Sequence, residues 1–148
     1  MVREKTMEKI LDIRLSEKKR AQKAYQQSAD NFEKVASQLY HLLKEKEKAE
    51  EAYQSSLNDS FPVQAITSQV SYLNSLKEKI VKLQYSVEDA RNIMVSQQGK
   101  LTESFIEAKK YEKLIEFQKD KKSEWKRETE NKQMDEISVT HFLNHRVR

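Results

Sequence analysis

From Ile66 to Ile115, an apolar side chain recurs at every seventh position of the sequence. A straight α-helix makes one turn in about 3.6 residues, so a seven-residue stripe drifts around it. Two helices keep such a stripe buried only by supercoiling around each other with a left hand. The stripe therefore predicts an all-α coiled coil whose function lies on its outer surface. Its members are Ile66, Leu73, Ile80, Val87, Met94, Leu101, Ala108 and Ile115.

The composition agrees with long helices, because the 148 residues include one glycine and one proline. At this length we expect a single domain over residues 1–148. The chain has no cysteine, which excludes disulfides and thiolate metal sites and is compatible with a reducing cytoplasm. No stretch approaches the ~20 apolar residues of a membrane span, and the N-terminus does not have the pattern of a signal peptide.

The net charge of +4 comes from 28 basic and 24 acidic residues that are mixed along the helices. Mixed signs are typical of solvated helix faces with ion pairs four residues apart. No basic stripe is interleaved with aromatic residues, so nucleic-acid binding is not favoured. A nucleic-acid-binding rod remains a minor alternative, with salt-dependent affinity for DNA as its signature.

The first half of the chain carries heptads of its own, strongest from Phe32 to Leu42. Arg14, Lys18 and Lys46 enter this seam, where long basic stems can cover apolar surface. The first core position of each heptad is Leu11, Lys18, Tyr25, Phe32, Leu39, Lys46 and Tyr53. The second core position is Met7, Arg14, Ala21, Ser28, Val35, Leu42, Ala49 and Ser56.

The strongest break in the sequence is the stretch from Leu57 to Val63, which contains Asn58, Asp59 and Pro62. These residues favour caps and turns, and proline is excluded from helix interiors. We therefore predict one helix over about 3–57, a turn at about 58–62 and a second helix over about 63–140. A connection this short makes the helices antiparallel, which predicts a monomeric two-helix hairpin.

Centring the turn on Phe61 places Leu39 opposite Leu83, Leu11 opposite Tyr111 and Met1 opposite about Lys121. Residues after Lys121 then overhang without a partner from the first helix. This overhanging C-terminal helix still carries apolar side chains, which favours docking onto another protein. They are Trp125, Met134, Ile137, Val139, Phe142 and Leu143.

No catalytic constellation or phosphate-binding glycine loop is evident, so no cofactor is expected. His141 and His145 are four residues apart, but the intervening residues do not form a metal-protease motif, and two surface histidines are the simpler interpretation. The lone Gly99 indicates a soft point or close packing in the second helix. Tyr40, Tyr72 and Tyr85 fall beside or outside the seam, where an aromatic residue can pack on a flank or anchor an interface.

Several segments resemble the FliJ family of flagellar type III export proteins. They are Met7–Arg14, the Gln38-Leu39 pair with Leu42, Tyr53 with Leu57, the stretch from Tyr72 to Ile80, and Lys132–Ser138 with its Met-Asp-Glu-Ile element. The resemblance implies a non-enzymatic, stalk-like coiled coil in the cytoplasm, at the inner face of the cell membrane. It also implies binding to the export ATPase (FliI) and to the cytoplasmic domain of the export gate (FlhA), with export chaperones as further candidate partners.

Carried onto this chain, the resemblance implies a gate-binding set of Gln38, Leu42, Tyr53, Tyr72 and Leu76. Lys79 and Leu83 depart from the family pattern, which can present a small residue and a histidine there. Leu42 and Leu76 also fill core positions, so seam packing is an equal interpretation for them. The open end of the hairpin, with the overhang, is implied to bind the ATPase through Met7, Leu11, Trp125, Met134, Ile137 and Phe142.

Two other functions stay open at this stage. One is a stalk or chaperone of a virulence-type (injectisome) secretion system, which would bind an injectisome ATPase in preference to a flagellar one. The other is a purely structural coiled coil, in which a helix continuous through Pro62 would dimerise and double the mass.

Overall fold

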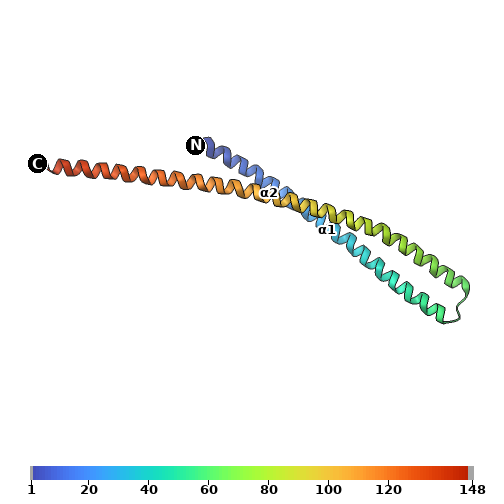
Figure 1. Ribbon diagram of the computed structural model, residues 1–148. Helices are drawn as coiled ribbons and strands as arrows, with labels where there is room; N and C mark the ends of the chain where they lie inside the picture. The colour runs from blue at the N-terminus through green and yellow to red at the C-terminus, as the bar shows by residue number, and fades with distance from the viewer. Residues whose placement is uncertain (1, 147–148) are drawn as a thin grey trace. The chain divides into compact units, whose positions relative to one another are not determined.

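The computed structural model describes residues 2–146 as two long α-helices (Figure 1). Helix α1 is Val2–Asn58, with 57 residues, and helix α2 is Val63–Arg146, with 84 residues. No strand occurs in this described range. The prediction of an all-α fold built from two long helices is confirmed. Helix α2 continues beyond the expected end near residue 140, and residues 1, 147 and 148 of the predicted domain lie outside the described residues.

The chain divides into two compact units. We call Met1–Lys18 together with Ser104–Arg148 the terminal unit, and Lys19–Glu103 the turn unit. Each unit contains a length of α1 and a length of α2, so each has its own stretch of helix-to-helix contact. The expectation of a single domain stays a prediction.

The seam follows the seven-residue repeats. Every heptad core position predicted for the two helices is buried or half-buried. In the turn unit the most deeply buried apolar residues are Leu73, Leu76, Ile80 and Ala90, and in the terminal unit they are Ala108 and Ile115. Burial of this apolar strip, and not helix propensity alone, holds such long helices together.

The break between the helices covers residues 59–62, where the Asp59 amide donates to the Ser55 carbonyl over 3.2 Å. Pro62 stands immediately before α2. Its carbonyl accepts hydrogen bonds from the amides of Ala65 (3.1 Å) and Ile66 (3.3 Å), which begin the helix. Because proline has no N–H to satisfy, this position tolerates it while a helix interior does not.

A polar layer interrupts the seam next to the turn. Ser56 is buried, and its hydroxyl donates to the Ala52 carbonyl over 2.9 Å. The same hydroxyl accepts a hydrogen bond from Gln69 Nε2 on α2 over 3.0 Å. Leaving a buried polar group unpaired costs about 1–3 kcal/mol, so this contact disfavours sliding one helix along the other. Gln69 Oε1 is buried without a partner in the described structure.

In the terminal unit, two basic side chains occupy the seam and cover aromatic rings. The Arg14 guanidinium lies 5.8 Å from the centre of the Tyr111 ring and forms an ion pair of 3.1 Å with Glu17. The hydrogen bond and charge of Glu17, with a smaller contribution from Tyr111, raise the pKa of Arg14. Lys18 Nζ lies 4.0 Å from the centre of the Phe105 ring. The sequence placed Leu11 opposite Tyr111. In the structure the Tyr111 ring lies under Arg14, which is about one helical turn after Leu11.

We expect Ile80→Ala to lower the free energy of unfolding by about 2–4 kcal/mol, because it leaves a cavity in the seam. Ile80 is 5% exposed, while its neighbour Val81 is 49% exposed and provides a matched control. Val81→Ala should change the free energy of unfolding by less than about 0.5 kcal/mol. Urea unfolding followed by circular dichroism measures both, and equal losses would contradict this assignment of the seam.

Gly99→Ala should raise the free energy of unfolding by about 0.5–1 kcal/mol, because alanine is the better helix former. A methyl group at Gly99 would meet no atom within 4 Å, and no described residue has a positive φ. Of the two interpretations from the sequence, close packing at Gly99 is therefore wrong. A lower urea midpoint for Gly99→Ala than for the parent chain would show that this position needs glycine.

Candidate functional site

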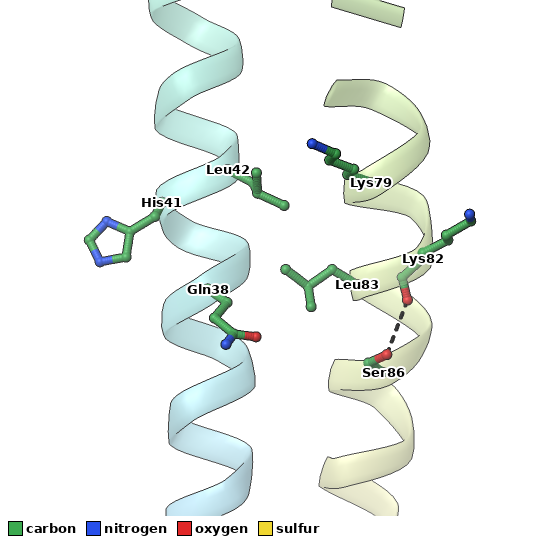
Figure 2. A pocket seen from close by; sticks show the side chains of 7 residues that line it. All are labelled: Gln38, His41, Leu42, Lys79, Lys82, Leu83 and Ser86. Carbon is green, nitrogen blue, oxygen red and sulfur yellow. Dashed lines mark hydrogen bonds between the residues drawn. The ribbon is translucent and has the colours of Figure 1, made fainter. Parts of the chain in front are cut away.

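A groove of about 510 Å³ lies between α1 and α2 in the turn unit, on the flank of the seam (Figure 2). Both helices contribute side chains to it. The lining residues are Gln38, His41, Leu42, Lys79, Lys82, Leu83 and Ser86.

The floor of the groove is apolar. Leu42 from α1 and Leu83 from α2 both point into the space between the helices, and both are half-buried (Figure 2). Gln38 and Ser86 stand beside them, and the Ser86 hydroxyl donates to the Lys82 carbonyl over 3.3 Å. The two leucines are therefore only partly covered.

The ionisable side chains that line the groove are Lys79, Lys82 and His41. Lys79 extends toward α1 above the leucines, whereas His41 and Lys82 point outward from their helices and mark the two rims (Figure 2). The His41 ring also lies edge-on to the Tyr40 ring, at 5.8 Å between centres. No acidic residue lines the groove, and no ion pair of 4.0 Å or less joins Lys79 or Lys82 to an acid of residues 2–146.

Of the gate-binding set implied by the family resemblance, only some residues line the groove. Gln38 and Leu42 line the groove together with Lys79 and Leu83, the two positions that depart from the family pattern. Tyr53 is half-buried, and Tyr72 is 51% exposed but does not line the groove. Leu76 is 2% exposed, so its side chain is packed inside the seam.

His41, Lys82 and Ser86 line the groove but were not identified from the sequence. One signal could have found the first two. His41 and Lys82 immediately precede the core leucines Leu42 and Leu83, so they occupy matching positions beside the seam on the two helices.

The second candidate surface is the end of α2 in the terminal unit. Lys122 Nζ lies 3.7 Å from a carboxylate oxygen of Glu4, near the beginning of α1. From residue 123 to residue 146, which we call the overhang, every residue is exposed except the half-buried Thr129. Its large apolar side chains are each more than half exposed: Trp125, Met134, Ile137, Val139, Phe142 and Leu143.

The other residues predicted for ATPase binding, Met7 and Leu11, are half-buried in the seam of the terminal unit. The overhang also brings the His141 and His145 rings together, with centres 5.2 Å apart. Within residues 2–146, no group of three or more histidine, cysteine or acidic residues could hold a metal ion. In that same range, no helix combines the length and the apolar character needed to cross a bilayer.

Comparison with known proteins identifies the family. The model of the family described as "Flagellar FliJ protein" matches residues 4–146. The Flagellar FliJ protein of Bacillus subtilis (strain 168) is 33% identical over 136 residues, which cover 92% of this chain and 92% of that protein. A solved structure described as a YscO homolog from Chlamydia trachomatis has 20% identity over 96% of both chains and a TM-score of 0.46, too low to establish a shared fold.

The family match and the Bacillus subtilis relative both cover nearly the whole chain, and they confirm the resemblance found in the sequence. With its two long helices and its heptad seam, this chain belongs to the flagellar FliJ protein family.

Proposed function

We propose that this chain is a non-enzymatic component of the flagellar type III protein export apparatus. In this proposal its overhang binds the export ATPase (FliI), and the groove face of its turn unit binds the cytoplasmic domain of the export gate (FlhA). The observation that carries the proposal is the groove itself. Two residues that the family resemblance assigns to gate binding, Gln38 and Leu42, line it from α1.

The overhang supports the ATPase part of the proposal. A single helix with large, exposed apolar side chains has the character of a segment that docks into an apolar surface. Each such side chain contributes about 1.5–3 kcal/mol when it becomes fully buried. Because Met7 and Leu11 are half-buried in the seam, we assign them an indirect role, namely supporting the part of α2 that leads into the overhang.

One chain with two binding surfaces can connect two partners. Docked on the ATPase through its overhang, the protein would promote assembly and activity of the ATPase ring. Through the groove face it would couple that ring to the export gate at the cytoplasmic face of the membrane. A role in escorting export chaperones is compatible with the same surfaces.

The double variant Ile137→Ala/Phe142→Ala should weaken binding to the purified flagellar export ATPase by at least about tenfold, since it removes two apolar anchors. Stimulation of ATP hydrolysis should fall in parallel. Tyr85→Ala/Val95→Ala is a matched control, because these side chains are also more than half exposed but lie in the turn unit. Full stimulation by the Ile137/Phe142 variant would refute the assignment of the overhang.

Tyr72→Ala should weaken binding to the cytoplasmic domain of the export gate while leaving the melting temperature within about 1–2 °C of the parent, since Tyr72 is half exposed. Leu76→Ala should instead lower the free energy of unfolding by about 2–5 kcal/mol, because it empties a buried position. Calorimetric binding and thermal unfolding of both variants separate the two roles. A loss of stability in Tyr72→Ala as large as in Leu76→Ala would remove the case for a surface anchor at Tyr72.

A further inference from the structure

We infer that the groove of the turn unit accepts an acidic amphipathic segment of a protein partner, and that Lys79 is the main determinant of this charge preference. The inference rests on the proposed function, because the groove face is the surface assigned there to the export gate. It adds the chemistry of the partner segment. The family resemblance does not specify that chemistry, because two of the lining residues, Lys79 and Leu83, depart from the family pattern.

The floor of the groove determines the apolar half of the partner. Leu42 and Leu83 are half-buried and point into a space of about 510 Å³. Their exposed portions are adjacent across the two helices, so one apolar side chain can cover both at once. Apolar anchors at helical spacing are the usual way in which an amphipathic helix lies in such a groove.

The charges determine the polar half. The Lys79 ammonium extends toward α1 next to the apolar floor, with no acid in the lining and no ion pair within 4.0 Å. Glu45 on α1 and Glu78 on α2 are the neighbouring acids by helical position, yet neither lines the groove. A carboxylate beside Lys79 would be partly shielded from water by the bound segment, which strengthens the pair relative to one in open solvent.

The residues at the two rims of the groove also favour acidic groups on the partner. Lys82 and His41 lie on opposite outer edges and point away from the floor (Figure 2). A segment that buries an apolar face against the leucines presents its flanks to these rims. Acidic flanks therefore meet Lys79 and Lys82 on the α2 side and the imidazole N–H of His41 on the α1 side.

A nucleic acid fits the groove less well than an acidic protein segment. Phosphate backbones are bound by extended basic surfaces, and their affinity grows with the number of phosphates that are neutralised. Here the two lysines stand beside an apolar floor. That floor has no charge or hydrogen-bond donor for a phosphate, and a duplex would leave it largely exposed to water.

The test uses the full chain and two labelled helical peptides. Both peptides carry leucines along one face. One has glutamates on the flanks, and its twin has glutamines in their place. We compare the parent chain with Lys79→Glu/Lys82→Glu by fluorescence anisotropy at low and at physiological salt. The matched control is Lys109→Glu/Lys113→Glu, which changes the formal charge equally at two exposed lysines of the terminal unit.

We expect the parent chain to bind the glutamate peptide at least about tenfold more tightly than its twin at low salt, with the preference reduced by added salt. The Lys79/Lys82 variant should lose this preference and the Lys109/Lys113 control should retain it. Equal affinity for the two peptides, an equal loss in the control, or tighter binding to duplex DNA that depends on Lys79 and Lys82 would each overturn the inference.

The same variants are then titrated with the cytoplasmic domain of the export gate. Binding by the parent chain that the Lys79/Lys82 variant loses by at least about tenfold supports both the proposed function and the inference. Gate binding that is equal in the parent and this variant overturns the inference while leaving the proposed function intact. No gate binding by the parent chain overturns the gate part of the proposed function, and the peptide comparison then decides the inference alone.

Discussion

Burial of one narrow apolar seam is the constraint on which the rest of this structure depends. Within residues 2–146, the two long helices have no sheet and no third layer to pack against, so the heptad side chains supply the burial. Few side chains are deeply buried, which spreads the stabilisation along the length of the seam. Both compact units draw on it, because each contains a part of α1 and a part of α2. After the Glu4–Lys122 contact, the large apolar side chains of α2 are each more than half exposed.

The same constraint explains where polar groups occur in the seam. The buried Ser56–Gln69 hydrogen bond stands next to the turn, and the basic side chains of Arg14 and Lys18 cover aromatic rings in the terminal unit. An apolar seam alone tolerates shifts by whole heptads, since one apolar layer resembles the next. A polar contact such as the Ser56–Gln69 hydrogen bond, which forms in one alignment and is lost in the others, reduces that freedom. The groove lies on the flank of the same seam, where His41 and Lys82 point away from the half-buried Leu42 and Leu83.

The sequence was sufficient to predict the seam, the turn and the overhang, because each follows from a local rule. Heptad spacing identifies the buried positions, Pro62 with its polar neighbours marks the turn, and the difference in helix length leaves the end of α2 unpaired. The groove did not follow from any such rule. It depends on which flanking residues of the two helices lie side by side. His41, Lys82 and Ser86 can therefore be identified as lining residues only once the alignment of α1 with α2 is known. Leu76 illustrates another case, since gate contact and seam packing were both open for it from the sequence and the fold packs it into the seam.

The two candidate surfaces are governed by different physics. The overhang offers apolar area along a helix on which charges of both signs alternate, so its contribution to binding grows with the area that a partner covers and changes little with salt. The groove offers a small apolar floor beside two lysines that form no ion pair with an acid of residues 2–146, so much of its selectivity comes from charge, which salt screens. A chain with both surfaces can hold one partner mainly by buried area and select the other mainly by charge. In the proposed function, binding at one surface therefore does not depend on the chemistry that the other surface recognises.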